Sequence, residues 1–355
     1  SLVRLFRPNP YLIERLTITV TRQRLILVVA ATVLLSGCTG VIVPDGPGAT
    51  DIETGPTQAD GELAIHHIDV GQADSTLIIT PDGETILIDT GDWRQSGQQV
   101  IDYLDDLGVD RIDHLVSTHA HADHIGGHAE IIEYYETERG GVGAAYDNGV
   151  AHTSATYDRY LDAIETHDVD FFEVAEGDTL PLADDQLRAT VLNPPEGDSG
   201  TDLHPNSVVL LFNFGEFGYL TTGDAEAQTE QRLVDDWGES LDVDAYQAGH
   251  HGSSTSSTKP FMADVDPSIV ILSSGYDNQY GHPNNAVLDR FADRGVDAYW
   301  TGVHSDVVIT TDGENVTVNT AESHSTDPTE LIDSLPATEE SNSLTANTYI
   351  PTISP

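Results

Sequence analysis

Hydrophobic and polar positions follow a regular order between about residues 62 and 320. Three short runs open this block, at 62–70 (ELAIHHIDV), 75–80 (STLIIT) and 85–91 (TILIDTG), and their alternating β-branched residues predict strands. A Pro-Asp-Gly turn at 81–83 predicts that the second and third runs form a hairpin. Similar runs predict further strands at 113–119, 188–194, 207–214, 217–224, 244–250, 268–275 and 305–313.

Helical patterns separate these strands in both halves of the block. They predict helices at about 98–107, 124–136, 226–236 and 285–294. Since strands and helices alternate, with hairpins mixed in, we expect an α+β fold of two mixed sheets covered by helices. This is a four-layer αββα sandwich spanning residues 62–320.

The two ends of the chain have a different composition. Residues 1–38 carry several arginines and an apolar run from Leu25 to Leu35, which is shorter than the about 20 residues needed to cross a bilayer. The run leads into Leu-Ser-Gly-Cys, and Cys38 resembles the lipidated cysteine of a bacterial-type lipoprotein signal; the alternative is a free thiol beside an ordinary signal peptide. We therefore expect an exported protein, lipid-anchored on the outer face of the cell membrane through Cys38.

Low-complexity segments flank the folded block. Residues 39–61 are rich in Gly, Pro, Thr and Asp and predict a flexible acidic linker. Residues 321–355 are rich in Ser, Thr, Glu and Pro and predict a disordered tail.

The charge is extreme, with 14 basic against 60 acidic residues in 355, a formal net charge of −46. The acidic groups of such a surface repel one another in dilute buffer, and salt screens this repulsion. We therefore interpret the composition as adaptation to high salt, as in halophiles. The sequence shows no basic patch that would attract nucleic acid by counterion release, although molar salt also screens the repulsion.

Candidate chemistry is concentrated in STHAHADHIGG, residues 117–127. His119 and His121 leave the same face of a strand end, and Asp123 and His124 follow as the chain turns. Imidazole and carboxylate groups are ligands of zinc, manganese and iron. Four such groups in six residues exceed what one ion needs from one segment, so the pattern predicts a two-metal site.

These residues resemble the H-x-H-x-D-H signature of the metallo-β-lactamase superfamily. HIDVGQADSTLI with TILIDTG, LHPNSVVLLF, YLTTGDA, YQAGHHGSSTSS and NQYGHP are similar, in the same order, to the branch that includes the extracellular domain of the competence protein ComEC. The resemblance covers nearly the whole folded block and implies the four-layer fold, two divalent metal ions (zinc or manganese) and hydrolytic activity.

The resemblance also implies roles for individual residues. His119 and His121 would ligate the first metal, and Asp123 and His124 the second. Asp224 would bridge both ions, and His250 is preferred over the adjacent His251 as the last ligand of the second site. His204 matches the histidine that much of the superfamily adds to the first site, whereas the ComEC-like branch has Asn-Ser, here Asn206-Ser207; its role as a ligand stays open.

Weaker matches complete the candidate site. Asp69, Asp74 and Asp89 lie near strand ends and could support ligand histidines, although a structural turn role is equally open for Asp89. His282 could donate to a developing oxyanion or phosphate oxygen, or pack as an ordinary histidine. Ser253 could bind a phosphate or cap the next helix. Asp123 would orient a water nucleophile or take its proton. His128, one turn beyond His124, is not expected to be a ligand.

Three functions remain open at this point. The first is a metal-dependent phosphodiesterase or nuclease, which the ComEC resemblance favours and which would act on a phosphodiester such as DNA. The second is hydrolysis of a small ester, thioester, lactone or β-lactam by the same kind of site. The third is a non-catalytic lipoprotein that only binds metal, which the full set of ligands disfavours. Protein partners are unknown.

Overall fold

The computed structural model describes residues 7–8, 59–197 and 199–336. Apart from Arg7 and Pro8, the predicted signal segment with Cys38 lies outside the described residues, as do nearly all of the predicted linker and the end of the predicted tail. Within them, no helix is both long and apolar enough to cross a bilayer.

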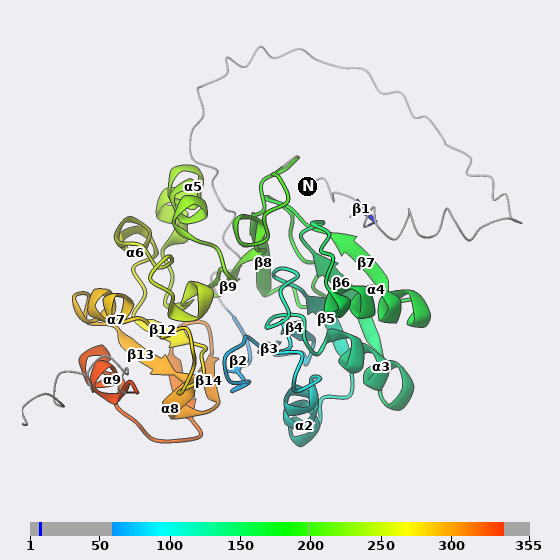
Figure 1. Ribbon diagram of the computed structural model, residues 1–355, viewed down its shortest axis with the longest axis horizontal. Coiled ribbons are helices and arrows are strands. Elements are labelled where there is room, and N and C mark those ends of the chain that lie inside the picture. The colour runs from blue at the N-terminus through cyan, green and yellow to red at the C-terminus, as the bar shows by residue number, and fades with distance from the viewer. Residues whose placement is uncertain (1–6, 9–58, 198, 337–355) are drawn as a thin grey trace, which may run out of the picture.

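The first sheet contains nine strands in the order β1-β7-β6-β5-β4-β3-β2-β14-β15 (Figure 1). Neighbours from β4 to β7 run parallel, and the pairs β2–β3, β3–β4, β2–β14, β14–β15 and β1–β7 are antiparallel. The predicted hairpin is confirmed, since Gly83 N donates to Thr80 O (2.9 Å) between β3 and β4. The strands are β1 (Arg7–Pro8), β2 (Leu63–His67), β3 (Thr76–Ile79), β4 (Thr85–Ile88), β5 (Ile112–Val116), β6 (Val142–Asp147), β7 (Asp170–Glu173), β14 (Val307–Thr311) and β15 (Val316–Thr320).

The second sheet contains six strands in the order β13-β12-β11-β10-β9-β8. Neighbours from β10 to β13 are parallel, and β9 is antiparallel to both β8 and β10. The strands are β8 (Leu187–Asn193), β9 (Val209–Phe214), β10 (Phe217–Thr221), β11 (Ala245–Gln247), β12 (Ile269–Leu272) and β13 (Asp297–Trp300).

Helices cover the outer faces of both sheets. The predicted helix at 98–107 is confirmed as α2, and the other three predicted helices are present with shifted ends. The helices are α2 (Gln98–Leu107), α3 (His128–Glu138), α4 (Ala155–His167), α5 (Ala227–Trp237), α6 (Lys259–Val265), α7 (Asn285–Ala292), α8 (Thr301–His304) and α9 (Pro328–Ser334), with 3-10 turns η1 (His204–Asn206), η2 (Gly238–Leu241) and η3 (Gly249–Gly252).

Alternation along the strands divides the interior into three apolar layers. In β3, Leu77 packs outward with residues of α2, α3 and α4, whereas Ile78 packs inward between the sheets. In β9, Phe212 faces inward and Leu211 faces outward, where it packs with residues of α5, α6 and α7. A period of two in each sheet thus produces the predicted αββα order of layers.

The folded part extends beyond the boundary predicted at residue 320. Residues 321–327 lead into α9, whose Asp327 side chain accepts a hydrogen bond from Thr329 N (2.8 Å) as an N-cap. Leu331 of α9 is fully buried in the layer outside the second sheet. The predicted disordered tail therefore begins too early, because one buried leucine and a capped turn fix this short helix on the domain.

Candidate metal centre

The centre lies where strands of the two sheets end. His119 and His121 follow β5, His204 begins η1, and Asp224 follows β10. His121 Nδ1 lies 2.9 Å from His119 Nε2 and 3.1 Å from His204 Nε2. His119 Nε2 and His204 Nε2 each lie 3.6 Å from Asp224 Oδ2. These four side chains form one group that could hold a metal ion.

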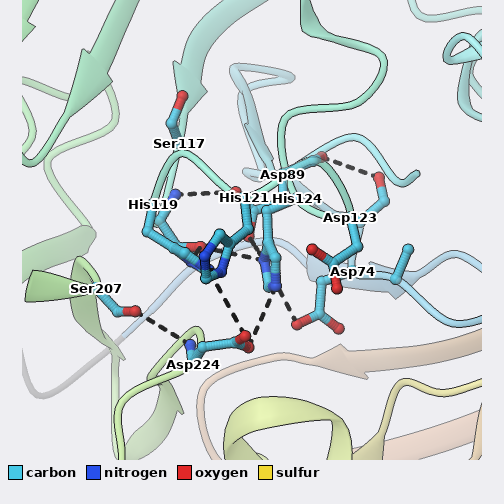
Figure 2. A network of polar contacts seen from close by, with 12 residues as sticks. Asp74, Asp89, Ser117, His119, His121, Asp123, His124, Ser207 and Asp224 are labelled. Atoms are coloured by element: carbon cyan, nitrogen blue, oxygen red, sulfur yellow. Dashed lines mark hydrogen bonds and ion pairs between the residues drawn. The ribbon is translucent and has the colours of Figure 1, made fainter. Parts of the chain in front are cut away.

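A second group shares Asp224 through its other oxygen. His124 Nε2 lies 3.2 Å and His251 Nε2 lies 3.8 Å from Asp224 Oδ1. Asp74 approaches both imidazoles, at 3.9 Å from His124 Nδ1 and 3.6 Å from His251 Nδ1. Asp123 Oδ2 lies 3.5 Å from His251 Nε2. Figure 2 shows Asp224 below His119 and His124, with Asp74 on the side of His124.

The two adjacent histidines of AGHHGS point to different parts of this arrangement. His251 lies with Asp74, His124 and Asp224, the place that the sequence analysis preferred for His250. His250 Nε2 lies 3.6 Å from Asp224 Oδ2, and its Nδ1 lies 3.3 Å from Glu226 Oε1. The geometry therefore favours His251 at the second site and groups His250 with His204 and Glu226.

Most of the distances from the Asp224 oxygens to the imidazole nitrogens are longer than hydrogen bonds, although His121 lies within hydrogen-bond distance of His119 and His204. Ligand atoms about 2.0–2.2 Å from a tetrahedral ion lie roughly 3.3–3.6 Å from one another, close to the 3.2–3.8 Å seen around Asp224. In addition, His124 Nε2, His251 Nε2 and Asp224 Oδ1 are buried and have no hydrogen-bond partner. Since buried polar atoms are normally paired, these three atoms fit the ligands of a bound cation. The residues present therefore fit the two divalent ions that the sequence predicts.

Hydrogen bonds on the far side of the rings fix how they face the centre. Asp89 Oδ2 accepts from the Thr118 hydroxyl (2.6 Å) and lies 2.7 Å from His124 Nδ1, while Asp89 Oδ1 accepts from Thr118 N (2.9 Å). His251 Nδ1 lies 3.0 Å from the carbonyl oxygen of Ser273. A proton held on Nδ1 leaves Nε2 free to face Asp224, the usual arrangement around ligand histidines.

The backbone is strained at the same residues. Asp89, His250 and His251 have φ values of 57°, 52° and 56°, in the left-handed region that costs a non-glycine residue roughly 1–3 kcal/mol. Gly223, just before Asp224, also has a positive φ of 50°, and a Cβ there would lie 2.8 Å from the Thr118 side chain. The fold thus holds unfavourable conformations where side chains must converge.

Protonation states in this cluster follow from burial and from the carboxylates. Burial lowers the pKa of His119 well below its ordinary value, and burial together with His204 lowers the pKa of His121 to about 4. Burial alone would also lower the pKa of His124, but the Asp224 and Asp89 carboxylates raise it well above the usual value. Burial thus favours the neutral form of His119 and His121, which is the form that binds metal, whereas the Asp224 and Asp89 carboxylates favour a positive charge at His124.

The other predicted residues occupy supporting or peripheral positions. The pKa of Asp69 is raised by burial, and its carboxylate accepts from Gly71 N (3.1 Å) outside the metal-binding groups. Asn206 Nδ2 donates to Asp202 O (2.8 Å) and so shapes the loop before η1. Ser253 Oγ bonds with the Thr255 hydroxyl (2.9 Å) inside its own turn. The His282 ring lies 5.8 Å from the His250 ring and 6.5 Å from the His251 ring, at the edge of the cluster.

Two residues that touch the centre were not predicted. Glu226 lies near His204 and His250, and it directly follows the motif YLTTGDA that contains Asp224. Gln247 Nε2 donates to Asp74 Oδ1 (3.1 Å), and its Oε1 accepts from the hydroxyls of Thr76, Tyr219 and Thr221. A polar residue inside the apolar strand β11 was the available signal for Gln247. His128, buried between Thr90 and Ser117, belongs to none of the metal-binding groups.

Known proteins resemble this chain in sequence. The family model of the metallo-β-lactamase superfamily matches residues 68–274. ComE operon protein 3 of Bacillus subtilis is 30% identical over 246 residues, covering 65% of this chain and 30% of that protein. Competence protein ComA of Neisseria gonorrhoeae is 29% identical over 240 residues, covering 67% and 30%, and Recombination protein 2 of Haemophilus influenzae is 31% identical over 230 residues, covering 64% and 26%.

The chain therefore spans less than a third of the length of these curated relatives. Among solved structures, the metallo-β-lactamase fold protein YhfI from Bacillus subtilis aligns with a TM-score of 0.48 and 12% identity, over 70% of this chain and 100% of that one. The matched family model, the two helix-covered mixed sheets and the shared histidine-carboxylate centre agree with one another, and the chain belongs to the metallo-β-lactamase superfamily of hydrolases.

Proposed function

We propose that the protein is a metal-dependent phosphodiesterase that cleaves nucleic acid. The observation that carries this proposal is the position of Asp224, whose two oxygens face two separate groups of imidazoles. The chemistry that a pair of divalent cations supplies when bound is polarisation of a substrate oxygen and activation of water near neutral pH. His119, His121 and His204 would hold one cation, His124, His251 and Asp123 the other, and Asp224 both.

Other side chains of the chain position the reactants. Asp123 has a side chain that is 33% exposed, and the neighbouring imidazoles outweigh burial and hold the pKa of its carboxyl well below the usual range. It is therefore an ionised acceptor at the open edge of the centre, placed to orient a water molecule. His282 stands beyond His250 and His251, where it could donate to a phosphate oxygen.

The choice of a phosphodiester is supported by the relatives. The names of two of them refer to competence and to recombination, and the ComEC-like motifs of this chain imply the nuclease activity of that branch. Because the chain spans less than a third of those proteins, a role in DNA uptake is no part of the proposal.

A substrate panel tests the proposal. The protein is assayed with bis-p-nitrophenyl phosphate, single-stranded DNA and a chromogenic β-lactam, with added zinc or manganese, in low and molar salt. We expect hydrolysis of the two phosphodiesters, its loss with a chelator, and its return with metal. Hydrolysis of the β-lactam alone, or of no substrate by a protein loaded with metal, would overturn the proposal.

We also propose, on the sequence alone, that the protein is exported and lipid-anchored through Cys38. Metabolic labelling with a radioactive fatty acid in an expression host with lipoprotein processing should label the wild type and not the Cys38→Ala variant. Equal labelling of both would contradict the proposal.

A further inference from the structure

Exposed aromatic rings gather beside the metal centre. Within the described residues, the large hydrophobic side chains that are strongly exposed are Trp93, Leu107, Tyr276 and Tyr280, with exposed fractions of 45%, 44%, 47% and 60%. Trp93 and Tyr280 line one cleft of about 640 Å³, and Asp123 lines the same cleft. Single exposed rings are common, but two that line the same cleft at the edge of the metal centre indicate a binding role.

Both rings are attached to the centre by short, defined turns. Trp93 N donates to Ala122 O (3.0 Å), which joins its loop to the segment that carries His121 and Asp123. Gly126 allows this approach, since a Cβ there would lie 2.1 Å from Trp93 N. The rings are therefore held in place relative to the metal-binding groups.

Asn278 organises the turn that carries the second ring. Its Oδ1 accepts from Tyr280 N (3.0 Å) and His282 N (3.1 Å), and its Nδ2 donates to Gly275 O (2.7 Å). The Tyr280 ring stacks on the His282 ring at 5.8 Å and 29°. Tyr280 thus presents its other face outward, next to a residue of the centre.

Polar groups of the cleft are available to a ligand. Gln72 Oε1 is buried and has no hydrogen-bond partner, and Gln72 Nε2 lies 3.5 Å from His282 Nδ1. Gln279 also lines the cleft, whereas the Asn278 side chain, which lines it too, is engaged in its own turn. Amide groups beside aromatic faces match the edges and faces of a nucleobase, which carries hydrogen-bond donors and acceptors around a planar ring.

One basic residue lines this cleft in a chain of net charge −46. The Arg94 guanidinium lies 5.1 Å from the Trp93 ring centroid, and its side chain is 67% exposed. It is paired with Asp92 Oδ2 at 2.9 Å, and because the Asp92 side chain is only 12% exposed we expect this pair to persist, with the remaining N–H groups of Arg94 facing a phosphate. With a base stacked on Trp93 and a phosphate near Arg94, the backbone of the nucleic acid would lie beside Asp123.

We propose that this cleft binds an unpaired nucleobase of the substrate against the exposed rings of Trp93 and Tyr280, so that the enzyme prefers single-stranded nucleic acid. This inference rests on the proposed phosphodiesterase function and adds a specificity site to it. Bases in a duplex are stacked and paired and offer no free face, whereas an unpaired base gains about 1–3 kcal/mol by stacking on an aromatic side chain.

Binding to the metal-stripped full-length protein tests the inference without any cleavage. Fluorescence anisotropy of end-labelled probes gives dissociation constants for a short oligothymidine, a DNA hairpin duplex and an abasic strand of the same length. We expect the oligothymidine to bind at least about fivefold more tightly than the abasic strand, because only the former can stack. Quenching of Trp93 should accompany binding, since Trp237 and Trp300 are buried.

Matched variants separate stacking from folding. Trp93→Leu and Tyr280→Leu should each weaken oligothymidine binding about fivefold or more, and Trp93→Phe should restore most of it. Tyr276→Leu is the control, because this exposed ring stacks on Trp300 (5.8 Å, 23°) and does not line the cleft. Unchanged circular dichroism will show that the variants fold.

Equal affinity for the oligothymidine and the abasic strand would overturn the inference, as would an equal loss in the Tyr276 and Tyr280 variants or no binding at all. The two proposals fail separately. Base-dependent binding without hydrolysis of bis-p-nitrophenyl phosphate would refute the phosphodiesterase and leave the cleft, whereas hydrolysis with base-independent binding would do the reverse.

Discussion

The two sides of Asp224 differ in how far they are open to solvent. On one side, His124 and His251 have side chains that are 0% and 2% exposed, and Asp89 and the Ser273 carbonyl hold their outer nitrogens. On the other side, His119 is also buried, but His204 and His250 are 26% and 20% exposed, and their outer nitrogens face Glu226, which is 38% exposed. The buried side is held by fixed partners, and the open side borders solvent, so we expect ligand loss to matter more on the buried side.

The largest expected effect comes from removing the residue that both sides share. Asp224→Ala should lower phosphodiester hydrolysis by a factor of about 10³ or more, because both cations lose a ligand. Elemental analysis should find the metal content reduced from two ions per chain to one or fewer. Asp235→Ala, an exposed carboxylate on α5, is the control and should change neither value. Retention of two ions by Asp224→Ala would contradict the shared role.

The adjacent histidines allow the sharpest test of the comparison. His251→Ala should weaken binding of one cation by at least about 100-fold, since loss of a ligand costs more than loss of its supporting partner. His250→Ala should weaken it by less than about tenfold, because that side chain is partly solvated. Competition with a chromogenic chelator measures both. A larger effect for His250→Ala would restore the assignment that the motif alone favoured.

Asp89 tests whether the buried side depends on its outer hydrogen bonds. Asp89→Asn keeps the size of the side chain but weakens its hold on His124 Nδ1, so metal affinity and activity should fall about 10- to 100-fold. The Thr118 hydroxyl also bonds Asp89, and Thr118→Val should show a smaller loss. Affinity equal to that of the wild type in Asp89→Asn would show that burial alone orients the ring.

Glu226 provides the corresponding test on the open side, with the smallest expected effect. Glu226→Gln removes an exposed charge from two imidazoles, and exposed ion pairs contribute only about 0.2–1 kcal/mol, so activity should change less than about fivefold. Assaying the single variants Asp89→Asn and Glu226→Gln in parallel compares the buried side with the open side directly. Equal losses would remove the distinction between them.

Much of this centre was predictable because its residues lie in short motifs at strand ends. The segment from His119 to His124 and Asp224 could be placed from spacing and resemblance. The choice between His250 and His251 could not, since both residues adopt left-handed φ values and the direction of each ring follows from that turn, not from spacing. The cleft with Trp93 and Tyr280 was also beyond prediction, because the two residues meet only in the folded chain.

The fold likewise contains elements that could be predicted from the sequence and elements that were missed. Most strands rich in β-branched residues were predicted, although β15 (VTVNT) was not, and β6 was missed because its sequence, VGAAYD, consists largely of small residues with weak strand preference. Helix α4 was missed although Ser154 caps it and Tyr157, Tyr160 and Ile164 repeat with helical spacing on its buried face. Close reading of that spacing would have found α4; β6 is specified by its parallel neighbours β5 and β7.

The pairing of β2 with β14, and of β14 with β15, brings the first and last strands of the block at 62–320 to one edge of the larger sheet. A unit that starts and finishes at neighbouring points can be joined to other sequence on both sides without disturbing its interior. This geometry explains how the same module can form part of proteins more than three times as long as the aligned region, as in the relatives from Bacillus subtilis and Neisseria gonorrhoeae.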